Sequence, residues 1–79
     1  MRVLFFAGLG EKIGRGVVEV EHREGMSLED LRLFIAERFP ETKEVLFQAM
    51  MAVNHEYALP HQLLHPDDEI AFIPPVSGG

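Results

Sequence analysis

The segment Glu69-Ile70-Ala71-Phe72-Ile73, followed at once by Pro74-Pro75-Val76-Ser77-Gly78-Gly79, decides how this chain is interpreted. Its first five residues are rich in β-formers and predict the last strand of a sheet. The six residues after them carry no helix or strand pattern, and their two adjacent prolines favour a stiff, extended course. We therefore divide the chain into a folded domain, residues 1–73, and an extended C-terminal tail, residues 74–79.

Two further strands are expected near the start of the chain. Residues 3–7 form an apolar run that is typical of a strand. Residues 17–21 alternate, so that Val18 and Val20 should point inward while the acidic residues point outward. The glycine-rich stretch between these strands, residues 8–16, predicts a flexible hairpin connection.

The main helix is expected to begin after Ser27, which has the side chain of a good N-cap. Leu28, Leu31 and Ile35 then recur at helical spacing and form one apolar stripe. Pro40 disfavours helical geometry in the residue before it, so the helix should end near residue 38.

The remaining segments supply smaller elements. Residues 41–47 favour a short second helix, residues 50–54 a strand, and Tyr57 with Ala58 the start of a returning strand. Residues 59–65 contain a proline and two adjacent leucines, which favour a short helical turn that plugs the edge of the core.

This order of elements predicts an α+β fold of the β-grasp kind, in which one main helix covers one face of a mixed sheet. Strand alternation also directs apolar side chains to the opposite face: Leu4, Phe6, Ala71 and Ile73. No predicted segment covers that second face, so we expect an exposed apolar patch suited to docking. The alternative is that sheet twist and short connections hide these side chains.

Composition excludes several classes of function. A net charge of −6 over 79 residues disfavours binding to nucleic acid and to anionic membrane surfaces. The absence of cysteine excludes disulfides, thiolate zinc sites and thiol nucleophiles. No apolar stretch approaches the roughly 20 residues that span a bilayer, and we expect a cytoplasmic protein.

Side-chain sites are weakly indicated. His61 and His65 have a helical ligand spacing but lack a clear third ligand beyond Asp67 and Asp68, so we expect surface histidines and no metal. The two aspartates more plausibly form a turn into the last strand.

The C-terminus is the stronger candidate for a reactive group. Gly78 and Gly79 have no Cβ, so they can enter a passage too narrow for other residues and present the α-carboxylate of Gly79 at its end. A carboxylate needs activation, for instance as an acyl-adenylate made with ATP by another enzyme. We expect no cofactor bound to this chain itself.

These features resemble one family over essentially the whole chain. The matching blocks are Val3-Leu4-Phe5-Phe6-Ala7, Leu9-Gly10-Glu11-Lys12-Ile13-Gly14, Ala52-Val53-Asn54 and residues 68–79. Together they resemble the MoaD/ThiS family of ubiquitin-like β-grasp sulfur carriers, and the Pro-Pro-Val-Ser-Gly-Gly ending resembles its molybdopterin synthase branch.

The resemblance implies a chemistry and a set of partners. Gly79 would be adenylated by an E1-like adenylyltransferase using ATP and converted by a sulfur donor system to a thiocarboxylate. The tail would then enter the active site of a large synthase subunit and give sulfur to a cyclic pyranopterin monophosphate precursor, forming the dithiolene of molybdopterin. The chain would be a non-catalytic, sulfur-donating subunit that is active only with the large subunit. The resemblance also implies a heterotetramer of two small and two large subunits.

The resemblance also assigns residues. Gly78 and Gly79 form the reactive end, and the partner-binding residues are Phe6, Tyr57, Ile73, Pro74, Pro75 and Val76. Three alternatives stay open: a carrier for thiazole synthesis, a ubiquitin-like protein modifier, and an interaction module with an inert tail.

Overall fold

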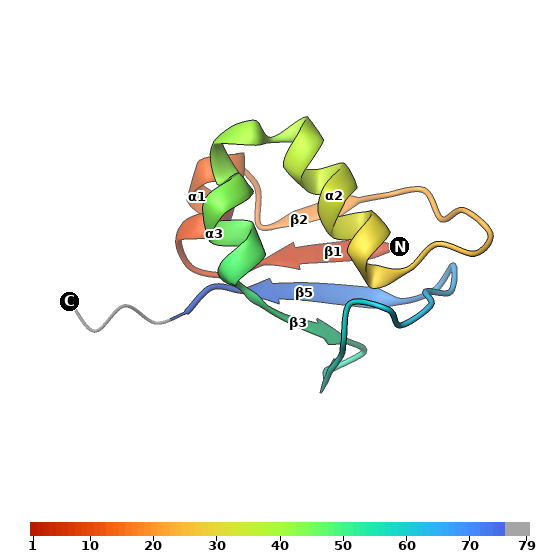
Figure 1. The fold of residues 1–79 in the computed structure, drawn as a ribbon. Helices are drawn as coiled ribbons and strands as arrows, with labels where there is room; N and C mark the ends of the chain where they lie inside the picture. Colours follow the sequence, from red (N-terminus) through yellow and green to blue (C-terminus); the bar gives the residue numbers. More distant parts are fainter. Residues whose placement is uncertain (76–79) are drawn as a thin grey trace.

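The computed structural model describes residues 1–75 and shows a mixed sheet with its helices gathered over one face (Figure 1). Within these residues the sheet has five strands, in the order β2-β1-β5-β3-β4. The strands are β1 (Arg2–Phe5), β2 (Val17–Glu19), β3 (Met50–Val53), β4 (Glu56–Tyr57) and β5 (Glu69–Ile73). The helices are α1 (Gly8–Ile13), α2 (Leu28–Arg38), the 3₁₀ turn η1 (Pro40–Thr42) and α3 (Lys43–Gln48). The predicted α+β class is confirmed.

The first and last strands lie side by side at the centre of the sheet. β1 and β5 pair in parallel with Val3 opposite Ile70 and Phe5 opposite Phe72. The rings of Phe5 and Phe72 stack with centroids 5.9 Å apart. β2 and β3 flank this pair in antiparallel fashion, so the sheet is mixed, as predicted.

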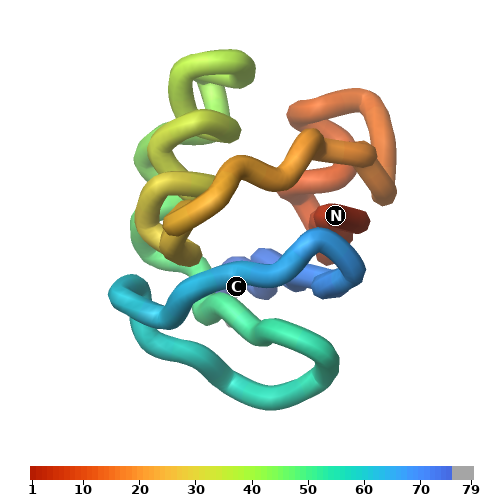
Figure 2. The backbone as a smooth tube through the Cα atoms, turned by 90° about the vertical axis from the view of Figure 1, so that its right-hand side faces the viewer, coloured from red at the N-terminus to blue at the C-terminus, as the bar shows by residue number. Residues whose placement is uncertain are grey.

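The core lies between this central pair and α2. Leu28, Leu31 and Ile35 are fully buried, as the helical spacing predicted, and they pack in one cluster with the inward side chains of β1 and β5. In Figure 2, α2 and α3 lie at the left of the view and the segment that contains α1 lies at the right, and all three pack on the same core. Burial of each large aliphatic side chain stabilises the fold by about 1.5–3 kcal/mol.

A reciprocal cap fixes the start of α2. The Ser27 hydroxyl accepts from the Asp30 N–H at 3.1 Å, and the Asp30 carboxylate accepts from the Ser27 N–H at 2.9 Å. The free N–H groups of Leu28 and Glu29 donate to the carbonyls of Gln62 and Pro60. The predicted N-cap is confirmed, and the helix ends before Pro40 as expected.

The hairpin predicted around residues 8–16 is confirmed, since β1 and β2 pair in antiparallel fashion. The prediction that its connection is flexible is wrong, because Gly8–Ile13 forms α1. β1 accordingly stops at Phe5, two residues before the expected end, where Ala7 adopts a positive φ. Leu9 is fully buried, and burial of this one side chain favours the helix despite its glycines. Close packing explains the glycine at position 10, since a Cβ there would lie only 3.1 Å from the Phe5 carbonyl oxygen.

The helical turn predicted for residues 59–65 is also wrong. This segment contains a turn at Pro60 and His61 and a single bridge between Ser27 and Leu63. Its backbone is used instead to satisfy the first N–H groups of α2. Leu64 is nonetheless buried, so the expected filling of the core edge does occur.

Asp68 anchors the turn that leads into β5. Its carboxylate accepts from the His65 N–H at 2.7 Å and from the Asn54 side-chain amide at 2.8 Å. Burial opposes ionisation, but these hydrogen bonds and the nearby His65 and His22 outweigh it, so the pKa of Asp68 is lowered. The predicted turn before the last strand is therefore held by a buried carboxylate.

Removing the cap should destabilise the domain. We expect Ser27→Ala to lower the free energy of unfolding by about 1 kcal/mol, because the Asp30 N–H loses its acceptor. Ser27→Asp, which keeps an acceptor at the N-cap, should retain most of that stability. Urea unfolding of both variants tests this, and equal losses in the two would show that the cap contributes nothing.

The Asp68 contacts predict a pH dependence of stability. Because its folded pKa lies below the ordinary value of 3.8, the ionised carboxylate stabilises the fold above that pH, and the contribution is lost as pH falls below it. Asp68→Asn should cost about 1–3 kcal/mol near neutral pH, and the gap to the wild type should narrow in acid. The matched control is Asp67→Asn, at an exposed neighbour, and an equal effect there would contradict the assignment.

Candidate functional site

The start of the tail lies at the end of β5, beside the residue that follows β1. The Phe6 N–H donates to the Phe72 carbonyl at 3.2 Å, so Phe6 lies alongside the last residues of strand β5. Pro74 is half-buried and Pro75 is exposed. Val76, Gly78 and Gly79 lie outside the described residues, and their predicted roles stay predictions.

The uncovered face of the sheet carries a shallow apolar depression of about 340 Å³. We call it the outer face and define it by eight residues from β1, β3, β4, β5 and the adjoining turns. They are Leu4, Phe6, Ala52, His55, Tyr57, Glu69, Ala71 and Ile73. Phe6 is 47% exposed and Tyr57 72% exposed, so the apolar patch predicted from strand alternation is confirmed.

The register of the strands explains the shape of this depression. Ala71 pairs with Leu4 on one side and with Ala52 on the other, and Ala52 pairs with Tyr57. The two alanines have short side chains and form a low floor, whereas the larger side chains of Phe6 and Tyr57 rise beside it. The structure therefore brings Phe6, Tyr57 and Ile73, three of the predicted partner-binding residues, to one surface.

The charged end of the outer face lies away from the tail. Glu69, at the start of β5, contacts the Arg2 guanidinium at 3.6 Å and His55 Nε2 at 3.0 Å. These pairs are partly exposed and contribute little stability. The outer face is thus charged where β5 begins and apolar where β5 ends.

One exposed residue at this surface is missing from the sequence-based set. Met50 pairs with Ile73 and is 52% exposed, while the adjacent Met51 is buried. Adjacent methionines are more often core filling than a partner surface, but here only Met51 is in the core. Because successive side chains of a strand point to opposite faces, Met50 lies on the same face as Ala52, and Met51 lies on the opposite face. This alternation is the signal in the sequence that distinguishes the two methionines.

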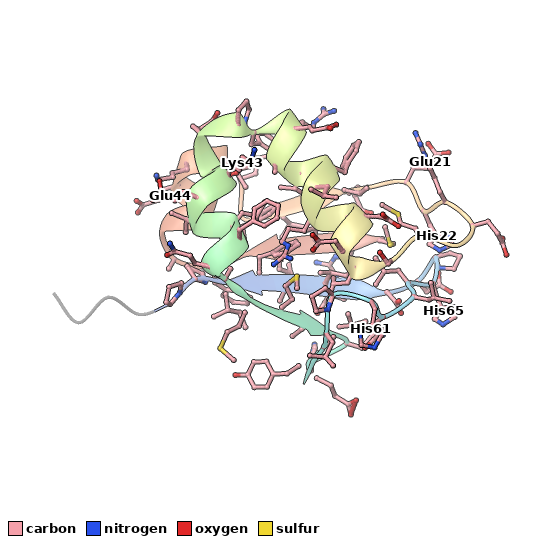
Figure 3. The ribbon with its side chains drawn as sticks, in the orientation of Figure 1. Glu21, His22, Lys43, Glu44, His61 and His65 are labelled. Carbon is pink, nitrogen blue, oxygen red and sulfur yellow. The ribbon has the colours of Figure 1, made fainter. Side chains whose placement is uncertain are left out.

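The histidines do not form a site in the part of the chain described. Figure 3 shows His61 and His65 on the loops at the end of the sheet where β5 begins, away from the tail. Across residues 1–75, no three His, Asp or Glu side chains gather closely enough to hold a metal ion. None of the helices described is long and apolar enough to cross a membrane.

Comparison with known proteins places this architecture in a family. The ThiS family matches residues 3–79. The molybdopterin synthase sulfur carrier subunit of Caenorhabditis briggsae is 36% identical, with 100% of this chain and 96% of that protein covered. The human protein of the same name is 38% identical, with 100% and 93% covered.

Solved structures agree on the fold. SAMP1 from Haloferax volcanii superposes with a TM-score of 0.87 at 26% identity, covering 99% of this chain and 97% of that one. A chain from the complex of subunits 1 and 2 of molybdopterin-converting factor from Helicobacter pylori gives 0.69 at 26% identity, with 99% and 96% covered. The predicted ubiquitin-like β-grasp fold is confirmed, and this chain belongs to the ThiS family.

Proposed function

We propose that this chain is the sulfur carrier subunit of a molybdopterin synthase. The observation that carries the proposal is an apolar outer face that adjoins the start of a tail ending in Gly78 and Gly79. Full-length similarity to proteins named molybdopterin synthase sulfur carrier subunits supports it. A surface for docking and a terminal carboxylate for chemistry are what such a subunit needs.

The proposed chemistry proceeds in three steps on Gly79. In an E1-like adenylyltransferase, its carboxylate attacks the α-phosphate of ATP, forms an acyl-adenylate and releases pyrophosphate. Reduced sulfur from a donor system then attacks the acyl carbon and displaces AMP, leaving a thiocarboxylate. In the large subunit, the sulfur passes to the cyclic pyranopterin monophosphate precursor, and water restores the carboxylate. Two such transfers form the dithiolene.

The chain's own contribution is placement. Docking of Phe6, Tyr57 and Ile73 on a partner would bury apolar side chains of the outer face, and Ile73 directly precedes Pro74. Because Pro74 and Pro75 restrict the backbone, this docking would also restrict the direction in which Val76 and the glycines extend. The solved Helicobacter pylori complex of subunits 1 and 2 supports a large-subunit partner. We further propose that two copies of this chain and two large subunits form a heterotetramer.

Tail chemistry can be tested by mass. We expect the chain, co-expressed with an E1-like enzyme and a sulfur source, to gain the mass difference of sulfur for oxygen at Gly79. The control is the chain lacking Gly78 and Gly79, which should gain nothing. An unchanged mass under conditions that thiolate a known carrier would refute the proposal, and a lysine-linked adduct would favour a protein modifier.

Docking can be tested with a matched pair of surface changes. Phe6→Arg should weaken binding to the large subunit on the order of tenfold or more, because a charge replaces an apolar anchor. The control is Leu33→Arg on α2, since Leu33 has nearly the same exposure (46% against 47%) but lies on the helical side. Calorimetric titration measures both affinities, and equal losses would exclude the outer face as the docking surface.

A further inference from the structure

β2 forms one edge of the sheet in the described chain, and its backbone has a defined outward side. The Phe5 N–H donates to the Gly16 carbonyl, and Met1 and Val20 exchange hydrogen bonds in both directions. In an antiparallel ladder the backbone of every second residue faces the partner strand. The backbone groups of Gly16, Val18 and Val20 therefore face β1, and those of the alternate residues face away. The alternate residues are Val17, Glu19 and, directly after Val20, Glu21.

A groove runs beside this edge, between β2 and α2. Two depressions, of about 280 and 500 Å³, adjoin along it and share Val20, Glu21 and Phe34. Phe34 is 38% exposed, although it belongs to the helix that covers the core. An apolar side chain projecting from a strand added at this edge could contact the exposed Phe34 ring here.

The edge carries two acidic residues that have no basic partner among the residues described. Glu19 and Glu21 are exposed, and neither forms an ion pair with any residue between 1 and 75. Arg2 lies opposite Glu19 in the ladder, but its guanidinium contacts Glu69. The larger depression is lined by Glu19 and Glu21 and also by Arg15 and Arg38. Figure 3 shows Glu21 at the end of this strand, on the side away from the tail.

We propose that the β2 edge binds an extended segment of a partner protein in which apolar residues alternate with lysine or arginine. Backbone groups of the segment would pair with Val17, Glu19 and Glu21, as in strand addition. Its apolar residues would enter the groove against Phe34, and its basic residues would pair with Glu19 and Glu21.

Charges alone would only protect a sheet edge from pairing. Protection of the edge from pairing does not require the exposed Phe34 beside the groove. The presence of Phe34 therefore favours a site that binds a strand of another protein. A second copy of this chain fits less well, because antiparallel pairing centred on Glu19 would set two Glu19 carboxylates opposite each other.

The probe is a capped heptapeptide, Lys-Val-Lys-Ile-Lys-Val-Lys, titrated into the ¹⁵N-labelled full chain. We expect hydrogen exchange of the Val17, Glu19 and Glu21 amides to slow about tenfold at saturation, whereas the already paired Val18 and Val20 amides change little. The same peptide with Glu in place of Lys should bind at least several-fold more weakly, because it meets like charges.

Two substitutions at one position separate backbone pairing from charge. Glu19→Pro removes an outward N–H that β1 does not use, and should abolish slowing at Val17 and Glu21. Glu19→Ala keeps the N–H and should weaken binding only about threefold. If Glu19→Pro does not fold by circular dichroism, the double variant Glu19→Lys, Glu21→Lys replaces it and should prefer the Glu peptide.

Three results would overturn the proposal. The first is no slowing of the three outward amides at roughly millimolar peptide, a concentration where weak strand addition is detectable. The second is a response confined to residues around Phe6, Tyr57 and Ile73. The third is slowing that rises with protein concentration in the absence of peptide, which would identify a second copy as the occupant.

Discussion

The parallel pairing of β1 with β5 is the constraint on which the rest of the structure depends. It joins the first and last strands of the domain at the centre of the sheet. β2 and β3 pair directly with these two strands, β4 is attached through β3, and α2 packs its buried stripe against them. Closing so long a loop costs conformational entropy, which grows only slowly with loop length. The stacked Phe5 and Phe72 rings and the aliphatic stripe of α2 offset that cost by burying apolar surface.

The same pairing decides where function is possible. In this register the side chains of Val3 and Phe72 are buried beneath the helices, whereas those of Phe6 and Ile73 lie on the outer face. A shift by one residue would exchange the two faces of a strand, exposing core side chains and burying the apolar side chains of the outer face. Stability and the proposed docking therefore require the same register. Because β5 leads directly into Pro74, that register also sets where the tail begins.

The sequence was informative where one physical signal dominated. Strand alternation predicted both faces of the central pair, and the Ser27 cap with its leucine stripe predicted α2. Prediction failed at Gly8–Ile13, where one buried leucine outweighed the low helix propensity of glycine, and no local pattern reveals such a tertiary contact. It failed again near Pro60, whose carbonyl is used as an acceptor by α2, a partner distant in sequence.

The outer face and the β2 edge lie on different parts of the sheet, and this separation has a functional consequence. In the proposed cycle the tail must be engaged first by an activating enzyme and then by an acceptor, so both would compete for the face around Phe6. The edge at Glu19 is one strand removed from β5 and faces sideways. A partner strand held there would leave Phe6 and Pro74 accessible. If both proposals hold, the sheet would bind one protein by its edge while successive partners exchange on its outer face.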